Sequence, residues 1–239
     1  MPKKNKIVVT GGTGRFAKNL KLVKSKYNFI YPGKKTLDIT SKKSILSFLK
    51  KKKPKSVLHL AGLSRPMVLH EKNIIKSINL NIIGTSNLVS ICSKLKIKLI
   101  YFSTSYVYKG DKGNYKESDP VLPWNNYAWS KLGGECAVQM YKNSLILRVC
   151  MTERPFIHKK AYANVKLNFI FHDQLAKILP KVLHQRGVLN IGGSTKTIYN
   201  FAKKYNPKVK KIFNSRKSLI KFPTKPFMNL SKLKKLTAL

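Results

Sequence analysis

A tyrosine and a lysine four positions apart are the residues of this chain that best fit acid–base chemistry. They are Tyr127 and Lys131, in the segment NYAWSK at 126–131. Residues four apart share a helix face, so the Lys131 ammonium is expected beside the Tyr127 ring. A nearby cation favours phenolate and lowers the pKa of a tyrosine from its usual value of about 10. The pair therefore predicts a group that transfers a proton near neutral pH.

A glycine-rich turn near the amino terminus predicts a dinucleotide site. The β-branched run at 6–10 is followed by GGTGRFA at 11–17 and then by a helical pattern. Strand, glycine turn and helix in this order are the context that a dinucleotide fingerprint requires. Gly11 allows the tight turn, and Gly14 allows the backbone to approach a pyrophosphate at the helix N-terminus. The alternative is an ordinary glycine-rich connection between a strand and a helix.

The residues after the second expected strand favour NADP(H) over NAD(H). No acidic residue stands there to hold a ribose 2′-hydroxyl, whereas Lys34 and Lys35 follow the strand and Arg15 lies in the glycine turn. Basic side chains at these places suit a 2′-phosphate.

Strands and helices alternate along the chain, which predicts an α/β fold with a doubly wound parallel sheet. Strands are expected at 6–10, 27–31, 56–61, 98–103 and 145–150, and helices at 14–26, 41–52, 71–95 and 125–142. A further helix is expected over 169–184 and a strand over 188–191. The segment 109–125, rich in Gly, Asp, Asn and Pro, is expected to be a loop before the helix that carries Tyr127.

Six short motifs in order resemble the extended short-chain dehydrogenase/reductases that act on nucleotide sugars, nearest the dTDP-4-dehydrorhamnose reductase branch. The matching segments are 10–17, 37–40, 59–62, 81–85, 102–108 and 127–131, with a weaker match through 169–173 and 190–193. The resemblance implies a Rossmann-like NAD(P)-binding domain at 1–150. It also implies a small substrate-binding lobe at 151–239, partly interleaved with the sheet, and a homo-oligomer.

The resemblance also implies roles for individual residues. Thr104 would hydrogen-bond the substrate carbonyl and Tyr127 would donate the proton. Lys131 would hold the nicotinamide ribose and tune Tyr127, and Asn81 would help to position Lys131 through a water. Two hydroxyl donors aimed at a carbonyl oxygen stabilise the negative charge that develops there. Thr104 as an ordinary strand end and Asn81 as a helix-surface residue are the alternatives.

The remaining predicted site residues belong to two groups. Those expected to bind the cofactor, besides Tyr127 and Lys131, are Gly11, Gly14, Arg15, Phe16, Asp38, Ile39, Leu60, Ala61 and Gly62. Those expected to bind the substrate are Ser64, Arg65, Ser105, Asn126 and Arg154. Trp124 and Trp129 either line the substrate pocket or belong to the core, and no metal site is expected.

Departures from the family pattern narrow the reaction. Dehydratases of this family carry an Asp-Glu pair directly after the threonine, and here Ser105 and Tyr106 stand there. Reduction of a nucleotide-activated 4-keto-6-deoxy sugar is therefore favoured, with an NAD-dependent 4-epimerase as the alternative. A non-catalytic dinucleotide-binding regulatory subunit also remains open. His59 stands where the family often has Asn, and we interpret it as a buried strand-end residue.

The charge of the chain is extreme. It has 49 Lys+Arg against 8 Asp+Glu, a net charge of +41 over 239 residues. Such a charge would attract nucleic acid. Because the lysines spread over the whole chain, we favour compositional bias over a nucleic-acid partner. The charge would still steer an anionic cofactor and a nucleotide-diphosphate sugar toward the protein.

The other composition features predict a cytoplasmic protein without a membrane span. The sequence has no apolar run of about 18 residues and no apolar signal core at its start. Its three cysteines, Cys92, Cys136 and Cys150, lack metal-ligand spacing, which suits reduced thiols.

Overall fold

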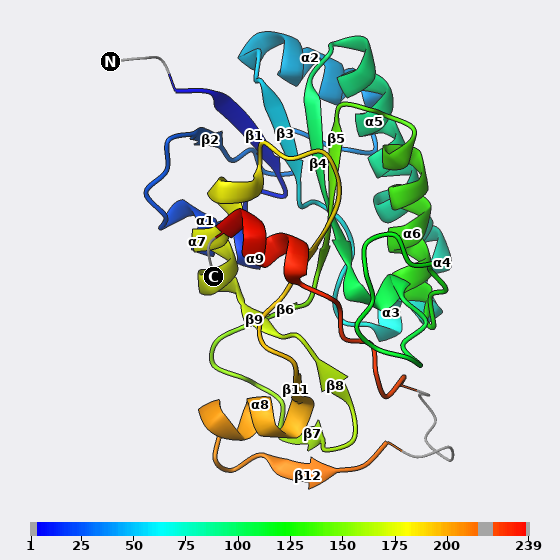
Figure 1. Ribbon diagram of the computed structural model, residues 1–239. Coiled ribbons are helices and arrows are strands. Elements are labelled where there is room, and N and C mark those ends of the chain that lie inside the picture. The colour runs from blue at the N-terminus through cyan, green and yellow to red at the C-terminus, as the bar shows by residue number, and fades with distance from the viewer. Residues whose placement is uncertain (1–3, 215–221, 238–239) are drawn as a thin grey trace.

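A central sheet of six parallel strands organises the computed structural model, which describes residues 4–214 and 222–237 (Figure 1). The sheet order is β10-β5-β4-β3-β1-β2, and every neighbouring pair is parallel. The strands are β1 (Lys6–Thr10), β2 (Asn28–Ile30), β3 (Ser56–His59), β4 (Lys98–Thr104), β5 (Ser144–Val149) and β10 (Gly187–Ile191). All of β5 and all but the first residue of β4 are buried, as expected for strands that are covered on both faces.

Helices cover both faces of the sheet. On one face lie α2 (Lys42–Lys52), α5 (Gly84–Lys94) and α6 (Asn126–Gln139), and on the other lie α1 (Arg15–Lys21), α7 (His172–Val182) and α9 (Ser231–Thr237) (Figure 1). Side chains alternate between these faces: Val8 packs toward α2 and α5, whereas Ile7 and Val9 pack toward α1 and α7. The prediction of a Rossmann-like doubly wound α/β fold is confirmed.

The expected helix at 71–95 is broken into several pieces. Its first part forms α3 (Val68–Lys72), and Asn73 then leaves the helical conformation with φ −141°. The Asn73 side chain accepts a hydrogen bond from the Lys76 backbone and so begins α4 (Ile74–Ser77). A π-helical stretch, η1 (Ile78–Ile83), follows before α5. The single-helix prediction is therefore wrong, because a local cap interrupts the apolar pattern.

The carboxyl-terminal third contributes to two parts of the molecule. The elements β10, α7 and α9 belong to the central sheet and its helix layer, while β6 (Met151–Thr152) pairs with β9 (Ile170–Phe171) beside it. The remaining elements form a small lobe at the bottom of Figure 1. They are β7 (Lys160–Tyr162), β8 (Lys166–Leu167), β11 (Lys196–Thr197), α8 (Ile198–Tyr205) and β12 (Lys210–Ile212).

Two expected elements of this region change. The helix predicted over 169–184 begins as strand β9, and α7 starts only at His172. The short strands of the lobe were not predicted, because strands of two or three residues have no measurable period. Within 4–214 and 222–237, no helix has the length and apolarity needed to cross a bilayer.

Candidate active site

A cavity of about 570 Å³ lies where β1, β3 and β4 end. The neighbours of β1 are β2 on one side and β3 on the other, so this is the point where the strand order reverses. Ligands of open α/β sheets bind at such points. The cavity is lined by every residue predicted to bind the cofactor, by Thr104, and by three of the predicted substrate residues, Ser64, Arg65 and Ser105.

Gly11, in the glycine turn, is packed too closely for any larger residue. Gly11 has φ +67°, and a Cβ there would lie 2.9 Å from the Ala61 Cα. The Gly14 backbone N–H donates to the Gly11 carbonyl at 2.8 Å, which closes the turn directly before α1. No side chain caps α1, so backbone N–H groups of its first turn point toward the cavity end of the helix.

A chain of hydrogen bonds joins the end of β1 to η1 through His59. The Thr10 hydroxyl lies 2.8 Å from His59 Nδ1 and accepts the N–H groups of the two residues after His59. On the other side, His59 Nε2 lies 3.0 Å from the Thr85 hydroxyl, which donates to the Asn81 carbonyl. Because the Thr85 proton is used there, Nε2 must donate and Nδ1 must accept. Burial lowers the pKa of His59 to about 3, so it is neutral.

Tyr127 and Lys131 both line the cavity, but the pKa of Tyr127 is raised and not lowered as expected. Burial raises the pKa of Tyr127, while the Thr104 hydroxyl and the charge of Arg65 act in the opposite direction. The Lys131 ammonium lies 4.2 Å from the centre of the Tyr101 ring, and burial lowers the pKa of Lys131 to about 7. The predicted lowering of the Tyr127 pKa by Lys131 is therefore wrong for this structure, because desolvation outweighs the charges.

Asn81 makes direct hydrogen bonds to Ser130, the residue before Lys131, and to the segment after β3. Its amide Nδ2 donates to the Ser130 hydroxyl at 2.8 Å and to the Leu63 carbonyl, and its Oδ1 accepts the Leu63 N–H at 2.7 Å. Ser130 in turn donates to the Tyr127 carbonyl at 2.7 Å. Asn81 thus joins the segment after β3 to the first turn of α6. It is buried and does not line the cavity.

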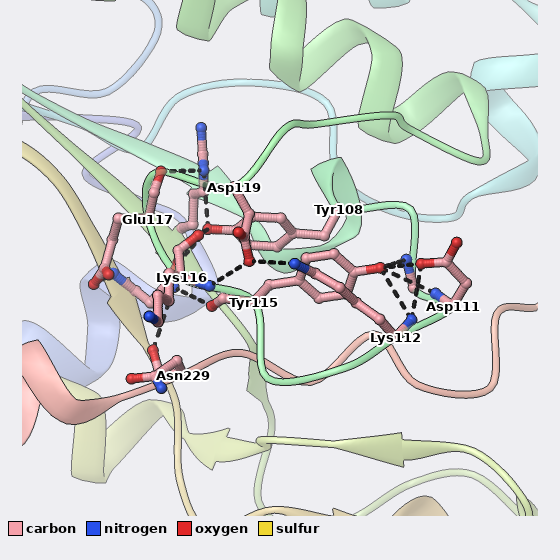
Figure 2. A network of polar contacts seen from close by, with 11 residues as sticks. Tyr108, Asp111, Lys112, Tyr115, Lys116, Glu117, Asp119 and Asn229 are labelled. Atoms are coloured by element: carbon pink, nitrogen blue, oxygen red, sulfur yellow. Dashed lines mark hydrogen bonds and ion pairs between the residues drawn. The ribbon is translucent and has the colours of Figure 1, made fainter.

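The expected loop between β4 and α6 is held by a polar network (Figure 2). The Tyr108 and Tyr115 rings stack at 4.8 Å, and the Tyr115 hydroxyl accepts the Gly110 and Asp111 N–H groups. Arg148 of β5 donates to the Tyr108 hydroxyl at 2.9 Å. The same arginine forms a buried ion pair with Glu135 of α6. These contacts connect the two elements that carry Thr104 and Tyr127.

Two predicted substrate residues lie outside the cavity. Arg154 stacks over the Phe171 ring, with its guanidinium carbon 4.0 Å from the ring centre, and Asn126 donates to the Glu71 carboxylate. Trp124 packs against Tyr106 and Phe222, and Trp129 is half exposed; neither lines the cavity. The cavity residues without a predicted role include Tyr106, Cys150, Glu153 and His172. Tyr106 and His172 lie in matched segments but were assigned no role, whereas Cys150 and Glu153 lie outside those segments.

A family match covers the part of the chain that builds this cavity. Residues 5–153 match the RmlD substrate binding domain family. The chain belongs to that family. The predicted resemblance to extended short-chain dehydrogenase/reductases of the dTDP-4-dehydrorhamnose reductase type is confirmed at this level.

Among curated relatives of this RmlD-family chain is the GDP-6-deoxy-D-talose 4-dehydrogenase of Aggregatibacter actinomycetemcomitans. It is 35% identical over 159 residues, which cover 63% of this chain and 52% of that protein. The methionine adenosyltransferase 2 subunit beta of Xenopus laevis is 29% identical over 124 residues, covering 52% of this chain and 37% of that protein. The matches thus span about a third to a half of the length of these relatives.

Solved structures of dTDP-4-dehydrorhamnose reductases share the fold over nearly the whole chain. The enzyme of Bacillus anthracis, solved in complex with NADP, superposes with a TM-score of 0.86 at 21% identity, covering 98% of this chain and 93% of that one. A hypothetical dTDP-4-dehydrorhamnose reductase of Sulfolobus tokodaii gives a TM-score of 0.82 at 23% identity, covering 96% and 94%.

Proposed function

We propose that this chain is an NADP(H)-dependent reductase of a nucleotide-activated 4-keto-6-deoxy sugar. The observation that carries the proposal is that Thr104, Tyr127 and Lys131 line the same cavity as the glycine turn. The dehydrogenase and reductase names of the relatives support an oxidoreductase of this type.

The cavity fits a dinucleotide in size and in charge. A volume of about 570 Å³ is typical of small-molecule sites. Four cationic side chains, Arg15, Lys34, Arg65 and Lys131, line it against two carboxylates, which suits a ligand with several phosphates. The glycine turn would hold the pyrophosphate, and Asp38 would face the adenosine. Lys34 and Arg15 would favour NADP(H) over NAD(H) through the 2′-phosphate.

The side chains of the cavity account for the proton side of the reaction. When bound, NADPH supplies the hydride. Thr104 and Tyr127 would hydrogen-bond the substrate carbonyl oxygen, and Tyr127 would transfer its proton to that oxygen. Since burial raises the Tyr127 pKa, the phenol is protonated at neutral pH, as a donor must be. Lys131 would orient the nicotinamide ribose, and Ser64, Arg65 and Ser105 would contact the nucleotide sugar.

The proposal is tested by replacing the proton donor. Tyr127→Phe removes the hydroxyl and keeps the ring, so NADPH binding should change by less than about threefold while turnover falls by a factor of about 10² or more. Turnover is followed by NADPH absorbance with a panel of dTDP-, GDP-, UDP- and CDP-sugars. Wild-type-like turnover in Tyr127→Phe would remove Tyr127 from the mechanism.

Two other functions make different predictions for the same assay. A non-catalytic dinucleotide-binding subunit is favoured by the similarity to methionine adenosyltransferase 2 subunit beta, and it would bind NADPH without consuming it. An NAD-dependent 4-epimerase would interconvert sugars with no net consumption of cofactor. Oxidation of NADPH by one nucleotide sugar would exclude both.

The partners and organisation that we propose complete this function. Residues 151–239 would supply the substrate-binding lobe, partly interleaved with the sheet, and the protein would act as a cytoplasmic homo-oligomer. The exposed surface of α6 and η1 supports self-association because it carries almost no positive charge. The segments 77–94 and 126–139 contain two basic residues: Lys131, which is buried, and Lys94, which is the last residue of α5. Nucleic acid is not the partner that we propose.

A further inference from the structure

One carboxylate in the candidate active site is shared by two arginines. Glu153 lies directly after β6, and its Oε1 is 2.9 Å from Arg15 NH1 and 3.2 Å from Arg65 NH1. Arg15 lies in the glycine turn and is the first residue of α1, whereas Arg65 lies in the segment after β3. All three side chains line the cavity. A single oxygen atom therefore connects the proposed cofactor side of the cavity to the proposed substrate side.

The other acidic residue of the cavity cannot play this part. The Asp38 carboxylate accepts hydrogen bonds from the Thr40 backbone N–H at 2.9 Å and from the Thr40 hydroxyl at 2.8 Å. Those bonds keep the Asp38 pKa low and tie the carboxylate to its own loop. Of the two carboxylates that line the cavity, Glu153 is thus the one that is paired with guanidinium groups.

We propose that Glu153 lowers the affinity of this cavity for phosphate-bearing ligands, by competing with them for Arg15 and Arg65. The inference rests on the proposed function, in which those ligands are a dinucleotide and a nucleotide sugar. A phosphate that binds either guanidinium either displaces Glu153 from NH1 or shares the arginine with it, and in both cases it meets the negative charge of Glu153 at short range. Ligands that make no further contacts are therefore bound more weakly than those that fill the cavity.

The charge of the whole chain gives this competition a function. A protein with a net charge of +41 attracts every polyanion, and a cationic cavity would retain many of them. An internal anion lowers the affinity for a bare phosphate group. It leaves the contacts of the adenine, ribose and sugar moieties unchanged. Glu153 in this way keeps weakly bound anions from occupying the cavity.

The test replaces Glu153 by its uncharged isostere. Glu153→Gln keeps the shape and one oxygen acceptor but removes the charge. The matched control is Asp173→Asn, which also removes one negative charge. Asp173 forms an exposed ion pair with Arg154, and neither residue lines the cavity. Binding of NADPH is measured by fluorescence titration and binding of ADP-ribose by calorimetry, each at low and high salt.

Glu153→Gln should bind NADPH about fivefold more tightly than wild type, and ADP-ribose, which lacks the 2′-phosphate, more tightly by a smaller factor. Both gains should shrink at high salt. Asp173→Asn should stay within about twofold of wild type. The gain should also shrink when Arg15→Gln is combined with Glu153→Gln, because the competition requires the arginine. Equal affinities for the two single variants, or weaker binding by Glu153→Gln, would overturn the inference and make Glu153 an organiser of the arginines instead.

These measurements use binding alone and need no turnover. NADPH that binds but is oxidised by no nucleotide sugar would contradict the proposed reaction and leave the comparison of Glu153→Gln with Asp173→Asn intact. Conversely, an active reductase in which the two variants bind alike would contradict only the role of Glu153.

Discussion

At the scale of single residues, the Lys131 ammonium lies on the face of the Tyr101 ring in the protein interior. The Tyr101 hydroxyl donates to the Lys131 carbonyl at 3.0 Å, so this tyrosine contacts both the backbone and the charge of Lys131. A cation on an aromatic face recovers part of the free energy of hydration that burial removes. The pKa of Lys131 is still lowered to about 7, which shows that this recovery is incomplete.

This lowered pKa predicts how stability depends on pH. Below about pH 7 both the folded and the unfolded states carry a protonated Lys131, and burial of the charge destabilises the folded state. Between about 7 and 10.5 the folded state has lost the proton and the unfolded state retains it, so stability rises with pH. The free energy of unfolding of wild type should gain up to about 1.4 kcal/mol per pH unit relative to Lys131→Met in this window.

Chemical denaturation at several pH values measures this difference. Lys50→Met, which replaces an exposed lysine at the end of α2, is the control and should show no such change in slope. Parallel curves for wild type and Lys131→Met would mean that Lys131 keeps an ordinary pKa in the folded protein.

At the scale of elements, His59 links the glycine-turn strand β1 to η1 through two threonine hydroxyls. Its hydrogen bonds require the neutral ring, as does its burial. The unfolded state binds a proton below about pH 6.5, whereas the folded state does so only near 3, so stability falls as the pH drops through this range. Between pH 6.5 and 5 the loss from this group is about 2 kcal/mol.

Replacing His59 should remove that acid sensitivity. In His59→Asn, the free energy of unfolding should fall less between pH 7 and 5 than in wild type, whatever its value at pH 7. Urea titrations at both pH values give the comparison, with His184→Asn as the control, since His184 is exposed just after the end of α7. An unchanged slope in His59→Asn would show that other groups cause acid denaturation.

At the scale of the whole molecule, the charge distribution predicts which surface meets another copy. Two protomers that each carry +41 repel one another unless they meet where lysines are absent. The α6 and η1 surface meets this condition and exposes apolar side chains, among them Trp129 at 49% and Ile83 at 44%. We therefore expect self-association through this surface.

A lysine placed on that surface should prevent the association. Trp129→Lys should shift the protein toward the monomer in analytical ultracentrifugation, by adding like charge and removing apolar area. Leu22→Lys is the matched control, because Leu22 is 85% exposed at the end of α1, on the other face of the sheet. If wild type is monomeric at all concentrations, or if both variants associate alike, this surface is not the interface.

Much of the fold followed from local patterns. The six strands of the sheet and the helices α2 and α6 were predicted to within a few residues, because buried parallel strands and capped amphipathic helices leave short-range patterns. The glycine turn also follows from the local sequence, since glycine readily adopts the φ of +67° that Gly11 has. For this reason the glycine turn, Thr104, Tyr127 and Lys131 could be assigned to one site from their order alone.

The sequence by itself thus determined the family, the parallel sheet and many of the residues that line one cavity. Only the tertiary structure decided which partners those residues take. Lys131 lies on the Tyr101 ring, Asn81 holds Ser130, and Glu153 joins Arg15 to Arg65. The reason is physical: the period of a helix or strand follows from neighbours along the chain, whereas burial and pairing depend on segments that folding brings together from far apart in the sequence.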